Sequence, residues 1–172
     1  QIANTSADQF RQEFECEFIG SASTLISPPK LSAMTYMNPI RSKDGVDIYE
    51  EPKVGHQYVV TADCARGFRL DYSAFVVMDV SVTPYKLVAK FRDNTITPMI
   101  YPQFLVNIGH YYNQAHVLIE TNDVGGQVAE SVAGQFEYEN VLKTVSKGRG
   151  GFQLGEGKDA KLGVTTSASV KK

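Results

Sequence analysis

Apolar and polar positions divide the chain into an irregular first third and a regularly patterned body that begins at His56. In the irregular part, prolines and glycines recur so often that no alternating or helical pattern is sustained. We therefore predict a linker with irregular loops over residues 20–55. On this basis we expect residues 1–55 to be a connector that follows another domain, and residues 56–172 to form a domain of their own.

The body alternates short apolar runs, typical of buried strands, with segments of helical spacing. Strands are predicted at residues 58–62, 72–80, 85–92, 116–119 and 140–145. Helices are predicted to begin at Thr97-Pro98 and at Gly125-Gly126. Strands joined by short turns are antiparallel neighbours, whereas strands separated by helices are parallel crossovers. The prediction is an α/β fold: a mixed sheet of three antiparallel strands followed by parallel crossovers, flanked by helices. The order β-β-β-α-β-α-β is that of ribonuclease-H-like domains.

Composition places the chain among ordinary globular domains, since 42% of its 172 residues are hydrophobic and 21% are charged. No apolar run approaches the roughly 18 residues of a membrane span, and the N-terminus lacks the apolar core of a secretory signal. Cys16 and Cys64 stand far apart without a CxxC pattern, so neither thiol is expected to bind zinc. A reduced, cytosolic protein is the simplest interpretation.

Charge is distributed unevenly along the chain. The formal net charge is only −2, but residues 141–172 carry +5 and the remaining 140 residues carry −7. An acidic body with a basic end can bind an anionic polymer locally while the whole protein stays soluble.

Two acidic residues, Asp63 and Glu120, each follow directly after an apolar strand run. Ligand sites of open α/β sheets lie at the carboxyl ends of the strands. If the two strands are neighbours, their backbones lie about 4.8 Å apart and both carboxylates reach one divalent cation. Hard oxygen ligands favour Mg²⁺ or Mn²⁺. The alternative is that each residue is only a solvated acid at a strand end.

Two further acids are candidates for the same edge. Asp71 lies where the hairpin returns into the second strand, and it is either a further ligand or a turn residue paired with Arg69. Asp123 precedes Gly125-Gly126, where N-capping of the helix explains it better than metal binding.

The glycine-rich stretch 148–158 is not a phosphate-binding loop, because Phe152 and Asp159 stand where a Walker A motif needs Gly and Ser or Thr. We expect instead a mobile loop whose basic residues bind the phosphate backbone of DNA, or, as the alternative, an ordinary surface loop. The basic residues assigned to DNA binding are Lys147, Arg149, Lys158 and Lys161, together with Arg66 and Arg69 in the turn after Asp63.

Three stretches together resemble the nuclease domain of the large terminase subunit of T-even-like tailed bacteriophages. They are residues 58–67 (YVVTADCARG), 71–74 (DYSA) and 117–126 (VLIETNDVGG). The earlier segment 10–18 (FRQEFECEF) resembles the part by which that family leaves its ATPase domain. The resemblance covers essentially the whole chain.

This resemblance implies a metal-dependent endonuclease that cuts concatemeric double-stranded DNA when genome packaging starts and ends. Asp63 matches the first catalytic acid of the family, Glu120 the second and Asp71 a further acid of the cluster. Two Mg²⁺ or Mn²⁺ ions are implied, with Asp63 bridging them and Glu120 holding one. The implied partners are DNA, the portal protein, the small terminase subunit and an ATPase domain of the same polypeptide, in the host cytoplasm at the procapsid portal.

The chain departs from this pattern in two respects. It contains no Walker A or B motif, so we expect a C-terminal fragment without the ATPase domain. The family also has a third catalytic aspartate in a His-Asp-Asp-like motif on a later helix, and no such motif occurs here. Glu156 and Asp159 lie in the glycine-rich stretch and are poor substitutes. The nuclease domain is therefore expected to be incomplete at its C-terminus.

Two alternatives from other classes stay open at this point. An actin-like or sugar-kinase-like phosphotransferase shares the three-strand opening and would turn over ATP rather than nick DNA. A non-catalytic module that docks on DNA or on a portal would retain the acids without binding Mn²⁺ tightly.

Overall fold

The computed structural model describes residue 30 and residues 33–147 and 151–166. Contacts divide the chain into two compact units, Gln1–Met37 and Asn38–Lys172, and every element described below belongs to the second. The segment 10–18 and Arg149, both singled out from the sequence, lie outside the described residues. No helix in the described part of the chain is long and apolar enough to cross a membrane.

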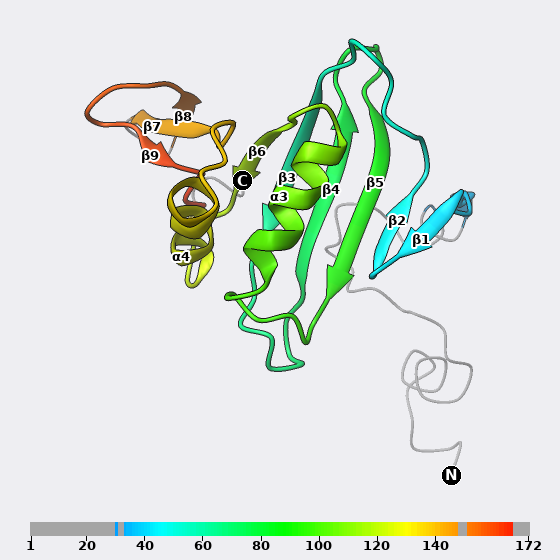
Figure 1. The fold of residues 1–172 in the computed structure, drawn as a ribbon, viewed down its shortest axis with the longest axis horizontal. Coiled ribbons are helices and arrows are strands. Elements are labelled where there is room, and N and C mark those ends of the chain that lie inside the picture. Colours follow the sequence, from blue (N-terminus) through cyan, green and yellow to red (C-terminus); the bar gives the residue numbers. More distant parts are fainter. Residues whose placement is uncertain (1–29, 31–32, 148–150, 167–172) are drawn as a thin grey trace, which may run out of the picture. The chain divides into compact units, whose positions relative to one another are not determined.

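A six-stranded mixed sheet forms the centre of this unit (Figure 1). Its strands are β1 (Arg41–Lys43), β2 (Val46–Ile48), β3 (Tyr58–Asp63), β4 (Ser73–Asp79), β5 (Lys86–Asp93) and β6 (His116–Ile119), in the spatial order β1-β2-β5-β4-β3-β6. The neighbours β3, β4 and β5 are antiparallel, and β6 lies parallel to β3. The four strands predicted between residues 58 and 119 are confirmed, as are their relative directions.

The β1–β2 hairpin was not predicted, and the expectation of irregular loops over residues 20–55 is wrong for this part. Asp44 and Gly45 at its tip both have positive φ, 52° and 78°. Two successive positive φ values are the geometry of the tight turn that Asp-Gly favours in hairpins. Because β2 pairs with β5, the hairpin extends the sheet beyond the predicted start of the body at His56.

The helix α3 (Tyr101–Tyr111) packs against the sheet and lies across β3 and β4 in Figure 1. Its first residue, Tyr101, is fully buried, stacks on Phe91 of β5, and donates a hydrogen bond to the Ala74 carbonyl of β4 (2.7 Å). The helix begins later than predicted because a turn precedes it, in which the amides of Ile100 and Tyr101 both bond to the Thr97 carbonyl.

The second helical segment follows β6 and confirms the predicted start at Gly125. The helix α4 (Gly125–Glu130) continues directly into a π-helical turn, η2 (Ser131–Gln135). Val128, Ala129 and Val132 are buried in the core that the helices share with the sheet.

The predicted fifth strand does not join the main sheet as a full strand. Val141 makes one isolated parallel bridge with Val117 of β6, and the chain then leaves the sheet. It forms a separate three-stranded antiparallel sheet from β7 (Lys143–Lys147), β8 (Gly151–Leu154) and β9 (Lys161–Leu162), in the order β8-β7-β9. The prediction of a mobile loop at 148–158 is therefore wrong for residues 151–154, which form β8. The prediction fails here because Val141, Leu142 and Val145 have the apolar pattern of one strand. In the structure, Val141 bridges to the main sheet, whereas Val145 belongs to β7 of the second sheet.

Candidate active site

The pairing of β3 with β6 determines where the two predicted acids lie. The strands run parallel with Ala62 opposite Ile119, and the Glu120 amide donates to the Ala62 carbonyl (2.8 Å). Asp63 ends β3 and Glu120 directly follows β6, so both follow their apolar runs at the same edge of the sheet. Adjacent strands lie about 4.8 Å apart, which brings the two backbones together as the sequence predicted.

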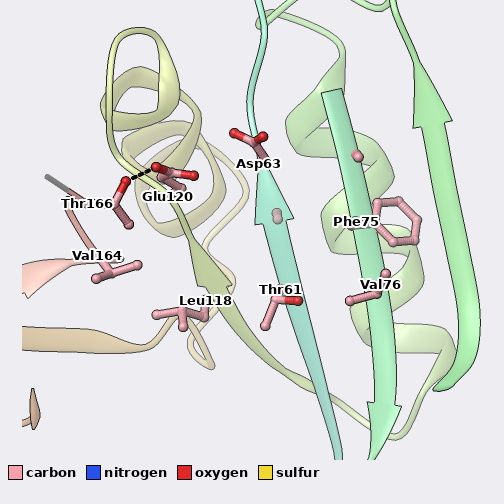
Figure 2. Close-up of a pocket in the computed structure, with 10 residues that line it drawn as sticks. Thr61, Asp63, Phe75, Val76, Leu118, Glu120, Val164 and Thr166 are labelled. Carbon is pink, nitrogen blue, oxygen red and sulfur yellow. Dashed lines mark hydrogen bonds between the residues drawn. The ribbon is translucent and has the colours of Figure 1, made fainter. Parts of the chain in front are cut away.

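Both carboxylates line one pocket of about 320 Å³. Figure 2 shows them at one end of this pocket, while Leu118, Thr61 and Val76 lie further back along the strands. Asp63 is exposed and Glu120 is half-buried. The pocket therefore combines two acidic groups with a largely aliphatic wall.

One oxygen of Glu120 is held by two hydrogen bonds. Thr166 donates its hydroxyl to Oε1 of Glu120, and the Asn122 amide Nδ2 donates to the same oxygen (3.1 Å). The Asn122 Nδ2 also lies 2.9 Å from both the hydroxyl and the carbonyl oxygen of Thr166. Neither Asn122 nor Thr166 is among the site residues predicted from the sequence. The β-branched run Val164-Thr165-Thr166 is the signal that could have indicated a strand-like segment there.

This segment reaches the site by pairing with the outer edge of β6. Val164 forms a parallel bridge with Glu120: its amide donates to the Ile119 carbonyl, and its carbonyl accepts from the Thr121 amide, both at 2.8 Å. Gly163 has a φ of +66°, and a Cβ at this position would lie 2.2 Å from the Ile119 carbonyl oxygen. Glycine is therefore required for the chain to approach β6 this closely.

Asp71 lies in a neighbouring pocket of about 590 Å³, which Asp63 also lines but Glu120 does not. In the described part of the chain no group of three or more His, Cys, Asp or Glu side chains is arranged to hold a metal ion. The structure therefore brings Asp63 and Glu120 together and leaves Asp71 to one side. A ligand role for Asp71 stays a prediction.

Arg66 and Asp123, which both line the pocket that contains Asp71, form a bidentate ion pair. Nε of Arg66 lies 2.8 Å from one carboxylate oxygen of Asp123, and a terminal nitrogen lies 2.5 Å from the other. The hydrogen bond from Arg66 lowers the pKa of Asp123. The prediction that Asp123 caps the following helix is wrong, because Val124 is the N-cap residue and no side chain caps α4. Arg66 is predicted to bind DNA, but in this structure its positive charge is neutralised by Asp123.

Cys64 lies between the acids and the core. Burial raises its pKa to about 12, and the charges of Asp63 and Glu120 contribute in the same direction. The thiol is therefore protonated at neutral pH and is not an activated nucleophile.

Four of the other residues predicted to bind DNA lie in the described part of the chain, and all four are solvent-exposed. Lys147 ends β7, Lys161 begins β9, and Lys158 lies in the connection between β8 and β9. Arg69 is exposed in the loop between β3 and β4, where it adopts a φ of 66° and its amide bonds to the Asn94 carbonyl (2.9 Å). No hydrogen bond or ion pair of the described residues engages the Lys147, Lys158 or Lys161 side chains.

Comparisons with known proteins identify a family and similar folds. A crystal structure of the large terminase nuclease from thermophilic phage G20c is 25% identical, with a TM-score of 0.50 over 58% of this chain and 50% of that one. The structures of that nuclease with bound zinc and with bound cobalt match equally well, over 56% and 50% of their chains. The chain thus spans about half the length of the terminase nucleases it matches. A family model described as "Terminase RNaseH-like domain" matches residues 60–161, more than half of the chain, and the chain belongs to this family.

Proposed function

We propose that this chain is the metal-dependent endonuclease domain of a large terminase subunit, and that it cuts concatemeric double-stranded DNA during viral genome packaging. The observation that carries the proposal is the pairing of β3 with β6, which brings Asp63 and Glu120 into one pocket. Membership of the terminase RNaseH-like family supports the DNA substrate. Assignment to the T-even-like phages, and to the procapsid portal in the host cytoplasm, belongs to the same proposal.

The donor set at the site fits a divalent cation. Two carboxylates at adjacent strand ends supply hard, anionic oxygens, and their mutual repulsion is relieved by a cation. The zinc and the cobalt bound in two structures of a similar nuclease support the binding of a divalent ion by this domain. We propose two Mg²⁺ or Mn²⁺ ions, with Asp63 holding both and Glu120 holding one. When bound, such ions neutralise charge on the reacting phosphate and lower the pKa of a coordinated water.

The protein's own residues contribute orientation. Glu120 is fixed through one oxygen by Thr166 and Asn122, so its carboxylate does not sample other rotamers freely. Asp63 is exposed, which leaves it accessible to a phosphodiester at the protein surface. Leu118 and Val164 line the pocket beside the acids and offer no competing polar groups to a cation.

The exposed basic side chains support binding of DNA through its phosphates. We propose that Lys147, Lys158 and Lys161 bind the backbone without reading bases, together with Arg149 and Arg69. Arg66 can join them only by exchanging its Asp123 partner for a phosphate. The portal protein, the small terminase subunit and an ATPase domain of the same polypeptide are the proposed partners in packaging.

Nicking of supercoiled plasmid by the purified chain in Mn²⁺ or Mg²⁺ tests the proposal. Asp63→Asn and Glu120→Gln should each reduce nicking to the level seen with EDTA, because each removes an anionic ligand. Asp44→Asn is the matched control: it makes the same chemical change at an exposed hairpin turn and should leave nicking unchanged.

Other outcomes would overturn the proposal. Nicking by Asp63→Asn at the wild-type rate would exclude the site. DNA binding without nicking would favour a docking module. ATP turnover without nicking would favour a phosphotransferase.

A further inference from the structure

The hydroxyl of Thr166 contacts a carboxylate 46 residues earlier in the chain. We infer that Thr166 is a positioning residue for metal binding: supported by Asn122, it fixes one oxygen of Glu120 and thereby presents the other to a divalent cation. This inference rests on the proposed function, since it assigns Glu120 to a cation. It adds a residue that neither the acid pattern nor the family match identifies.

The hydrogen bonds at Glu120 are one-sided. The Thr166 hydroxyl and Asn122 Nδ2 both donate to Oε1, whereas Oε2 accepts none of the hydrogen bonds found among the described residues. With one oxygen fixed, the carboxylate has a defined direction in which the other can coordinate. A single free oxygen favours coordination through one atom rather than through both.

Thr166 is itself held in place from two sides. Asn122 Nδ2 lies 2.9 Å from its hydroxyl oxygen and 2.9 Å from its carbonyl oxygen. The backbone just before it is paired with the Ile119–Thr121 stretch through Val164. The position of Thr166 therefore does not depend on its own bond to Glu120, so a substitution can remove that bond without displacing the segment.

The physical reason for such a residue lies in the flexibility of glutamate. A free Glu side chain loses rotamer entropy when a cation fixes it, and a hydrogen-bonded one has already lost it. Metal-binding carboxylates are usually hydrogen-bonded themselves, and removal of such a partner typically weakens metal binding or activity about 10- to 100-fold. The Thr166 hydroxyl is such a hydrogen-bond partner of Glu120. A threonine with a purely structural role would only help this segment to pair with β6.

The adjacent Thr165 provides a matched control. Its hydroxyl lies 2.9 Å from the Thr121 hydroxyl and makes no contact with Glu120. Thr165→Val and Thr166→Val make the same substitution in the same segment, and each removes one hydroxyl group and its hydrogen bonds. Only the second removes a bond to the carboxylate. Thr166→Ser keeps the hydroxyl and serves as the rescue variant.

The experiment measures Mn²⁺ binding directly, by electron paramagnetic resonance or calorimetry without DNA, together with thermal unfolding in EDTA. Thr166→Val should weaken Mn²⁺ binding about tenfold or more. Thr165→Val and Thr166→Ser should bind within about threefold of wild type. The two valine variants should unfold at similar temperatures in EDTA.

The inference is refuted if Thr166→Val binds Mn²⁺ as tightly as wild type. It is refuted equally if Thr165→Val weakens binding by the same factor, or if Thr166→Ser fails to restore it, because the hydroxyl on Glu120 is then not the cause. Failure of the proposed function looks different: wild type would bind no Mn²⁺, or Asp63→Asn would leave binding unchanged.

Discussion

A single methyl group added at Gly125 would collide with the backbone of Glu120 and so displace one of the two acids of the site. A Cβ there would lie 1.9 Å from the carbonyl oxygen of Glu120 and 2.9 Å from its carbonyl carbon. Both atoms are backbone, so no side-chain rotation relieves the clash. Gly125→Ala must therefore push α4 and the Glu120 backbone apart by more than an ångström.

The free-energy cost of Gly125→Ala depends on the hydrogen bonds that hold the backbones of Glu120 and Gly125. The Glu120 amide bonds to Ala62 of β3, and the Gly125 amide bonds to the Asn122 carbonyl (2.9 Å). Forced overpacking typically costs about 1–3 kcal/mol, and a weakened hydrogen bond adds about 0.5–1.5 kcal/mol. The gain in helix propensity from Gly to Ala is at most about 1 kcal/mol and smaller in a first turn. We expect a net loss of about 1–4 kcal/mol, which lowers the melting temperature by roughly 2–16 °C for a chain of this size.

The neighbouring glycine is the control. A Cβ at Gly126 would meet nothing closer than the Thr121 carbonyl oxygen at 3.8 Å, an ordinary contact. Gly126→Ala should therefore leave the melting temperature unchanged or raise it slightly. Thermal unfolding in EDTA compares the two, and Mn²⁺ binding by the folded variants reports on Glu120. Equal stability of the two alanine variants would refute the steric reasoning.

Two further predictions concern other parts of the domain. Burial alone would raise the pKa of Asp79, but hydrogen bonds from His56 and from the Ser81 amide outweigh it and lower the pKa below its usual 3.8. The ionised carboxylate therefore stabilises the fold above this pH, so Asp79→Asn should cost about 1–3 kcal/mol at pH 7. The difference from wild type should shrink as the pH falls from 3.8 towards the lowered pKa of the folded state, so urea unfolding should give a smaller difference at pH 3 than at pH 7. Replacing Lys147, Lys158 and Lys161 by Ala should reduce the slope of log K against log salt for DNA binding by about 2–3 units, equally for unrelated sequences. An unchanged slope would assign these lysines to an ordinary surface.

Local patterns predicted most of the sheet and both acids of the pocket. The strands β3, β4, β5 and β6 are contiguous runs whose buried positions can be recognised without knowing their partners. Asp63 and Glu120 were recognisable because each interrupts an apolar run at its end. The connection lengths then required β3 and β6 to be parallel, which brought the acids together.

The features that the sequence did not predict depend either on contacts between distant residues or on a turn that lies within the predicted linker. Asp44-Gly45 lies within the linker predicted over residues 20–55, although Asp-Gly is a strong hairpin signal. Val141 gave no indication that its strand would leave the main sheet after one bridge. Thr166 lies 46 residues from the carboxylate that it holds, and no local pattern connects the two. Asp123 precedes a helix as a cap would, but an arginine 57 residues away binds it instead.

The parallel bridges along β6 also cover an edge of the main sheet that could otherwise pair with another chain. A strand at the edge of a sheet presents unpaired amides and carbonyls, which invite another chain to add a strand. At β6 this edge is occupied at Val117 by Val141 and, just beyond the strand, at Glu120 by Val164. At the opposite edge β1 is only three residues long, is exposed, and carries Arg41 and Lys43, so charge and shortness discourage addition there. Release of the segment around Val164 would therefore uncover a template for aggregation as well as free the Glu120 carboxylate. The backbone hydrogen bonds of Val164 thus cover this edge and also hold in place the segment whose Thr166 hydroxyl bonds to Glu120.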